Sequence, residues 1–165
     1  MGNTDKDAIE ECAINDTPIH ECPNLVHFFS LSFTTGEPIV ITNGPKGHRC
    51  IVPDLKGTFK GGSDYPDFHG ILHGPSSDFV LIHSDGSGVS LDVNFIFTTH
   101  DGITFLGKIV GRSVRDANDP KKASIRGALT FEAGHEKLKF LNNLIAVSKG
   151  RKDGNKVEID YYLMS

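Results

Sequence analysis

The sequence predicts an all-β protein, a closed antiparallel β-barrel of about eight to ten strands. Apolar and polar residues alternate along most of the chain from Leu25 onward, and Asp-Gly pairs separate several of the alternating runs. Asp-Gly favours hairpin turns because glycine readily adopts the positive φ that these turns require. Several runs reach about ten residues, and strands of that length in an open sheet would leave long unpaired edges, which favours closure.

Length and charge distribution predict one folded domain and one tail. The chain has 165 residues, which is enough for one domain with one hydrophobic core. Its 38% apolar and 23% charged residues are typical of globular proteins. Acidic residues are concentrated near the N-terminus, whereas the rest of the chain is almost neutral. We therefore expect residues 1–22 to form a flexible acidic tail and residues 23–165 to form a single β-barrel domain.

The strands are expected in the following order along the chain. Strand-like runs cover residues 25–34, 39–41, 79–82, 89–99, 103–114, 138–149 and 156–164. Turn residues separate many of them, at 35–38, 43–47, 85–88, 100–102 and 153–155. One short helix is predicted over residues 119–125, because Asp119 can cap a helix and Pro120 suits its first position.

Charge and cysteine usage exclude several classes of protein. The chain has no basic stripe, so we expect no nucleic-acid partner. No apolar run approaches the roughly 20 residues of a membrane-spanning helix, and no signal peptide is visible, so we expect no membrane association. Cys12, Cys22 and Cys50 form no close pair, which favours reduced thiols and a cytoplasmic location.

The common metal and cofactor motifs are also missing. His69 and His73 would lie about 13 Å apart on one strand face, too far to share a metal ion. Neither a GxSxG elbow nor a GK[ST] phosphate loop occurs, so ordinary hydrolases, kinases and dinucleotide enzymes have little support. We therefore expect no metal and no cofactor.

One face of the hairpin predicted over residues 89–114 mixes polar and apolar side chains. Its members are Asp92, Asn94, Ile96 and Thr98, followed by Thr104, Leu106, Lys108, Val110 and Arg112. Either this face meets solvent and the opposite apolar face forms the core, or it lines a cavity inside the barrel. The alternation by itself favours the solvent-exposed interpretation.

Short motifs follow one another in a fixed order through the domain. They are Gly44-Pro45, Gly57-Thr58-Phe59, Gly70-Ile71-Leu72, Gly74-Pro75-Ser76-Ser77-Asp78-Phe79, Leu91-Asp92-Val93-Asn94-Phe95, Asp101-Gly102, Phe131-Glu132, Phe140-Leu141-Asn142 and Val147-Ser148-Lys149-Gly150. Their order and spacing resemble the family catalogued as domain of unknown function 3237, over roughly residues 25–163. The resemblance implies a closed β-barrel, and it favours the cavity interpretation of the mixed face.

The chain departs from the family pattern at aromatic and basic positions. It keeps Asp78 but has Phe79 where the family has tryptophan. It keeps Asp92 but has Asn94 where the family has arginine, and it keeps Asn142. Two acids and an asparagine are thus retained while their surroundings differ, which is typical of a specialised branch.

Some fungal proteins of this family are cofactor-free cyclases of polyketide pathways, which add a hydroxyl group across an alkene to close an oxygen heterocycle. The resemblance therefore implies a cofactor-independent cyclase or isomerase of fungal secondary metabolism, acting on a prenylated aromatic or polyketide substrate. Asp78 and Asp92 are the predicted acid and base, and His73 could replace either. Two carboxyl groups in one cavity push each other's titration apart, so one donates a proton and the other accepts one.

The remaining predicted site residues would contact the substrate. Asn94 and Asn142 would bond to its oxygens, Lys108 or Arg112 would stabilise an enolate or phenolate, and Phe79 and Ile96 would form an apolar wall. Each acid also has a structural interpretation. Asp78 could bond to nearby backbone amides at a turn or strand end, and Asp92 could be an exposed strand residue paired with Lys108.

A non-catalytic barrel is the alternative function. Such a barrel would bind or carry an apolar small molecule, as lipocalins do. An exposed strand edge could also pair two copies of the chain into a homodimer.

Overall fold

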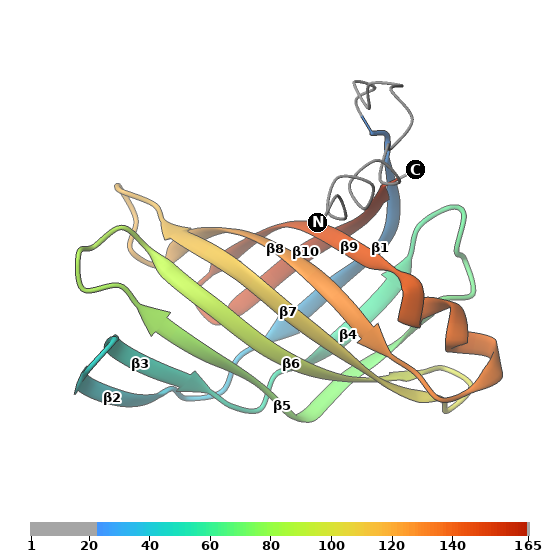
Figure 1. Ribbon diagram of the computed structural model, residues 1–165, viewed down its shortest axis with the longest axis horizontal. Helices are drawn as coiled ribbons and strands as arrows, with labels where there is room; N and C mark the ends of the chain where they lie inside the picture. The colour runs from blue at the N-terminus through green and yellow to red at the C-terminus, as the bar shows by residue number, and fades with distance from the viewer. Residues whose placement is uncertain (1–22, 165) are drawn as a thin grey trace, which may run out of the picture.

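The computed structural model describes residues 23–164, which form a closed eight-stranded antiparallel barrel with a two-stranded extension (Figure 1). The strands are β1 (Leu25–Thr34), β2 (Ile39–Gly44), β3 (Gly47–Val52), β4 (Lys56–Gly61), β5 (His69–Ile82), β6 (Val89–Thr99), β7 (Thr104–Arg115), β8 (Lys122–Glu132), β9 (Ile145–Asp153) and β10 (Lys156–Met164). A 3₁₀ helix, η1 (Glu136–Asn143), lies between β8 and β9. The predicted fold class is confirmed, whereas the predicted tail over residues 1–22 lies outside the described residues.

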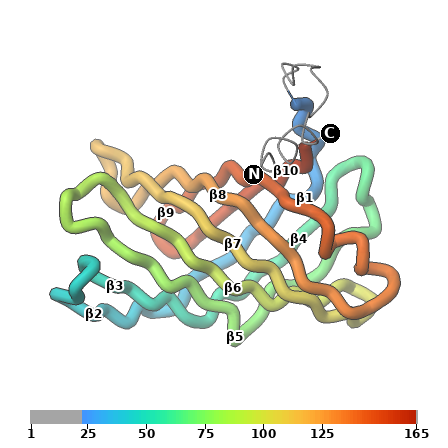
Figure 2. Tube along the Cα trace, viewed as in Figure 1, coloured from blue at the N-terminus to red at the C-terminus, as the bar shows by residue number. Residues whose placement is uncertain are grey.

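The long strand β5 closes the barrel and carries the extension. Its first part pairs with β4 and its second part with β3, both on the same side. On its other side it pairs with β6 along most of its length, which completes the circuit β1-β4-β5-β6-β7-β8-β9-β10. Closure gives each of these strands two neighbours, which removes the long edges of an open sheet. Figure 2 shows the β2–β3 hairpin continuing from β5 at one end of the barrel.

The mixed polar face of the β6–β7 hairpin is the outer surface of the barrel. On β6, Val93, Phe95 and Phe97 are buried, whereas Asp92 and Asn94, which alternate with them, are exposed. The cavity interpretation of this face is therefore wrong, and the solvent-exposed interpretation is right. The physical reason is that the alternate face carries the larger apolar side chains, whose burial contributes more free energy.

Aromatic side chains fill one half of the barrel interior. The cluster consists of Phe28, Phe29, Phe59, Phe68, Phe97, Phe105, Phe131 and Tyr161. Phe29 stacks on Tyr161 with ring centroids 4.5 Å apart, and Phe97 stacks on Phe105 at 5.1 Å. The other half is lined mainly by smaller aliphatic side chains, so space remains there.

The short helix lies elsewhere in the chain than the sequence predicts. Asp119 accepts a hydrogen bond from the Lys121 amide at 3.0 Å, but the chain then enters strand β8 instead of a helix. It does so because β8 must pair with both β7 and β9 to continue the barrel. The helix that forms, η1, buries Leu138 and Leu141 at the aromatic end of the barrel. The strand predicted over residues 138–149 is therefore wrong in its first part, because residues 138–143 belong to η1 and β9 begins only at Ile145. Within residues 23–164, no helix has the length and apolar character needed to span a membrane.

Tyr161→Phe is expected to stabilise the fold by about 1 kcal/mol. The Tyr161 side chain is fully buried, and its hydroxyl oxygen has no hydrogen-bond partner among the described residues. An unsatisfied buried hydroxyl group loses its hydration without compensation, and phenylalanine removes that cost. Chemical denaturation of both proteins would measure the change in the free energy of unfolding. A loss of stability would contradict the prediction, and Tyr162→Phe provides the neighbouring control.

Candidate functional site

A cavity of about 290 Å³ occupies the barrel half opposite η1. Most of its lining is aliphatic, and the side chains come from strands all around the barrel, among them Val80, Val93, Ile125 and Ile159. Two phenylalanines, Phe33 and Phe95, also contribute to the lining. The cavity is near the lower end of the volumes found for small-molecule sites, which are typically apolar with a few polar groups.

Asp78 supplies the one carboxyl group among the described residues that lines this cavity. It lies on β5 directly opposite Val52 of β3 and Val93 of β6, so its neighbours in the sheet are apolar on both sides. Its Oδ1 accepts a hydrogen bond from the Asp92 backbone N–H at 3.2 Å. The sequence alone cannot place Asp78 in this way, because its inward direction depends on the register of β5 in the closed barrel.

Burial raises the pKa of Asp78 from its ordinary value of 3.8 to about 6. The hydrogen bond from the Asp92 amide lowers this pKa, the Asp92 carboxylate raises it, and the Lys152 ammonium group lowers it. A carboxyl group with this pKa is partly protonated near neutral pH and can donate a proton there. Asp78 therefore has the environment of a general acid.

A thiol group and several cationic groups complete the polar part of the cavity. Cys50, on the inward face of β3, has its pKa raised mainly by burial, while the charge of Lys152 lowers it. Arg115, Lys121 and Lys152 contribute positive charge where the loops meet the cavity. None of these residues was predicted from the sequence to be a site residue. Lys152 could have been predicted to face inward from the alternation in residues 145–153. Every second residue from Ala146 onward, including Ser148 and Lys152, lies on the inner face of the strand.

The predicted site residues other than Asp78 lie outside the cavity lining. They are His73, Phe79, Asp92, Asn94, Ile96, Lys108, Arg112 and Asn142. The expected pair of carboxyl groups in one cavity is therefore not assembled. The reason is strand parity, because the side chains of Asp92 and Asp78 point to opposite faces of the barrel wall although their strands are neighbours.

The Asp92 side chain has the surface environment that the structural interpretation expected. Its Oδ1 lies 3.6 Å from Lys108 Nζ, and both side chains are more than half exposed. Phe79 is also on the outer surface, with 41% of its area exposed. The catalytic and substrate-binding roles predicted for these residues stay predictions.

His73 and Asn142 make structural hydrogen bonds. His73 Nε2 is 2.9 Å from Thr98 Oγ1, a residue of the neighbouring strand β6. Asn142 Oδ1 accepts a bond from the Ala133 amide at 2.7 Å, and its Nδ2 donates to the Ala133 carbonyl at 2.9 Å. The second pair attaches η1 to the chain just after β8. Within the described part of the chain, no three His, Cys, Asp or Glu side chains converge on a position suited to a metal ion.

Asp78→Asn is expected to stabilise the protein by about 3 kcal/mol at pH 7, because a pKa difference of about two units between the folded and unfolded states corresponds to that free energy. Well below pH 3.8, Asp78 is protonated in both the folded and unfolded states, so the wild type and the variant should differ little there. As the pH rises to about 6, the unfolded chain loses its proton first, and the wild-type folded state loses stability relative to the neutral variant. Denaturation curves at pH 4, 5, 6 and 7 would measure this, and a constant difference across the series would contradict it.

The fold and the cavity define a small β-barrel protein with an internal ligand-sized pocket. Residues 23–164 match the family described as "Protein of unknown function (DUF3237)", and the chain belongs to that family. Among curated proteins, no match was found.

Solved structures with the same fold come from bacteria and a fungus. A β-barrel-like protein of Acinetobacter baumannii is 22% identical, with a TM-score of 0.77 over 92% of this chain and 100% of that one. A conserved protein of unknown function from Rhodopseudomonas palustris is 20% identical, with a TM-score of 0.77 over 88% and 99%. An enzyme from Penicillium herquei is 22% identical, with a TM-score of 0.61 over 85% and 94%. These likenesses show a shared barrel fold, one instance of which belongs to a fungal enzyme.

Proposed function

We propose that this protein is a cofactor-independent cyclase that adds a phenol or alcohol oxygen across an alkene of the same substrate molecule. The observation that carries the proposal is Asp78, a carboxyl group inside an apolar cavity with its pKa raised to about 6. Family membership and the barrel fold shared with a fungal enzyme support it. The expected substrate is a prenylated aromatic compound or polyketide.

The reaction needs one proton to be given and one to be taken. Asp78 in its acid form protonates the less substituted alkene carbon, which leaves a cation on the other carbon and a carboxylate on the protein. The phenol oxygen bonds to the cationic carbon, and its proton returns to the Asp78 carboxylate. The product is an isomer of the substrate, and Asp78 ends in its starting form, so one carboxyl group suffices.

The cavity would contribute orientation and electrostatic stabilisation. A folded substrate inside a closed barrel has its oxygen held close to the alkene, which contributes several kcal/mol to lowering such barriers. Lys152 lies close enough to Asp78 to affect its pKa, so a substrate oxygen near Asp78 would also be near this ammonium group. Lys152 would thus stabilise the phenolate, a role predicted from the sequence for Lys108 or Arg112.

The test is incubation of the purified protein with prenylated aromatic polyketides, without added metal or nucleotide. Products would be separated by chiral chromatography and weighed by mass spectrometry. A single enantiomer with the mass of the substrate supports the proposal. Racemic product at the rate of the protein-free control, or unchanged substrate, contradicts it.

A non-catalytic binding barrel is the second candidate function. The location of Asp92 outside the cavity favours it, because a site with one carboxyl group lacks the separate base that a two-acid mechanism uses. A carrier would retain an apolar molecule through purification and protect it without changing its retention on a chiral column.

A further inference from the structure

Positive charge at the cavity mouth exceeds the negative charge available to balance it. Arg115, Lys121 and Lys152 line the cavity, and none of the three forms an ion pair with an acidic residue of the described chain. Asp78 is the acidic residue that faces them from within the cavity. In the same loop region, Asp119 pairs with Lys122 at 3.4 Å. Asp116 and Asp153 line the adjoining outer hollow and not the cavity.

A row of cations on the outer barrel wall extends this positive region. Arg112 on β7 lies directly opposite Arg126 on β8, which lies directly opposite Lys149 on β9. Like charges directly opposite one another on neighbouring strands destabilise a sheet. Among the described residues, none of the three forms an ion pair, and the one acidic residue directly opposite a member of the row is Asp160, which lies across from Lys149 on β10. The row of like charges is therefore expected to lower the stability of the sheet, and a binding function would explain its presence.

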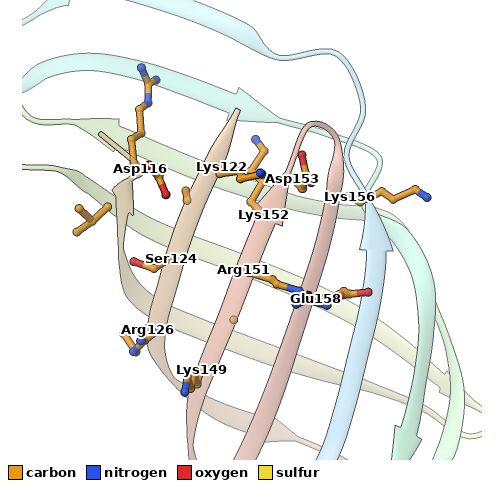
Figure 3. A pocket seen from close by; sticks show the side chains of 14 residues that line it. Asp116, Lys122, Ser124, Arg126, Lys149, Arg151, Lys152, Asp153, Lys156 and Glu158 are labelled. Carbon is orange, nitrogen blue, oxygen red and sulfur yellow. Dashed lines mark hydrogen bonds and ion pairs between the residues drawn. The ribbon is translucent and has the colours of Figure 1, made fainter. Parts of the chain in front are cut away.

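The outer row and the cavity mouth are continuous. Figure 3 shows Arg126 and Lys149 on one hollow of the outer wall, with the inward-facing Lys152 at the border between this hollow and the cavity. Arg115 and Lys152 line both this hollow and the cavity. In the hollow, Arg151 pairs with Glu158, with Nε and Oε2 2.7 Å apart. Seven basic residues line this hollow against three acidic ones, Asp116, Asp153 and Glu158, so an anion near the outer wall would meet a net positive surface beside the mouth.

We propose that the cavity binds apolar ligands that carry one ionised acid group, with the apolar body inside and the acid group held by Arg115, Lys121 and Lys152 at the mouth. This inference rests on the proposed small-molecule site and narrows its ligand class. Aliphatic lining favours the apolar body, and the excess of cations stabilises the anionic end. The outer row attracts such ligands over a longer range and speeds their arrival.

The cavity volume limits the size of the apolar body. A dry protein cavity of roughly 150 Å³ holds one benzene ring. The volume here, about 290 Å³, is therefore suited to a body of two fused rings or a chain of similar bulk. Naphthalene carboxylic acids have this size and one acid group, so they serve as probes.

Isothermal titration calorimetry of the full-length protein with 1-naphthoate and with 1-naphthalenemethanol would test the proposal. The two probes share the ring system and differ in charge. The carboxylate is expected to bind about tenfold more tightly than the alcohol, which is the range of one charge-assisted contact. The preference should shrink when the salt concentration rises from 50 to 500 mM. Equal affinities at low salt would overturn the proposal.

Variants that remove one positive charge would show which residues cause the preference for the carboxylate over the alcohol. Lys152→Met and Arg115→Gln should each weaken naphthoate binding several-fold and leave alcohol binding within about twofold. Lys60→Met, which removes the same charge from the exposed outer face of β4, is the matched control and should change neither. An equal loss in Lys60→Met would overturn the proposed contact. These outcomes concern binding alone, so absence of cyclase activity would refute the proposed function and leave this inference standing.

Discussion

Asp78→Asn is expected to lower the rate of cyclisation by about 10²–10⁴-fold, the usual contribution of a general acid. Asparagine has nearly the same shape as aspartate and can still accept the hydrogen bond from the Asp92 amide, so the cavity should keep its form. It cannot donate an acidic proton to an alkene. Initial rates for wild type and variant, followed by chiral chromatography at pH 6, would measure the effect.

Two further variants would show whether the loss of cyclisation rate is specific to Asp78. Asp67→Asn changes an exposed carboxyl group outside the cavity lining, and its rate should match the wild type within about twofold. Asp92→Asn distinguishes the single-carboxyl site from the sequence-based pair. A small effect is expected because the Asp92 carboxylate is on the surface, whereas a loss as large as that of Asp78→Asn would restore the pair.

Higher stability together with lower activity in Asp78→Asn would indicate that Asp78 is present for function and not for stability. Burial of an ionisable carboxyl group costs the fold free energy, as the raised pKa indicates. Residues that cost stability and are nonetheless present are frequent at functional sites. A variant that gained stability without losing activity would show that Asp78 is not the general acid of the reaction.

Phe29→Ala is expected to destabilise the barrel by about 3–5 kcal/mol, the range for deletion of a buried aromatic ring. Phe29 is 1% exposed and contacts several rings of the aromatic half. Its ring stacks on Tyr161 and lies edge-on to Phe59 at 6.0 Å and to Phe97 at 6.3 Å. Removing it leaves a cavity that the neighbouring strands of a closed barrel cannot collapse to fill. Guanidinium denaturation would measure the free energy of unfolding.

Phe140→Ala provides the matched control for this prediction. Phe140 is a residue of η1 with 44% of its area exposed, so its replacement should cost below about 1 kcal/mol. Similar losses for the two variants would show that the aromatic half does not dominate the stability of the barrel. Because Phe29 does not line the cavity, the expected loss of stability would be due to the aromatic half of the interior alone.

The local pattern of the sequence predicted seven of the ten strands at least in part and missed β3, β4 and β8. The alternation over residues 89–99 and 156–164 matches β6 and β10, and the Asp-Gly turns at 101–102 and 153–154 join the expected hairpins. These elements depend on neighbouring residues, whose preferences are visible in the sequence. The helix predicted at Asp119 was wrong because its capping residues serve a loop between two paired strands.

The site was predicted only in part. Family resemblance singled out Asp78, and the structure places it in the cavity. The same resemblance suggested Asp92, whose side chain has the opposite direction. Lys152 and Arg115 were missed because they come from strands far from Asp78 in sequence, and their charges meet only at one barrel end.

The sequence by itself determined the fold class, because strand periodicity and turn chemistry are local properties. It also showed which face of the longer strands is apolar, and the alternation by itself favoured the solvent-exposed position that Asp92 and Lys108 have in the structure. Only the tertiary structure decided where the interior is full and where it is empty. That outcome depends on the order in which the closed barrel stacks side chains from different strands, with phenylalanine rings at one end and smaller aliphatic groups around Asp78 at the other.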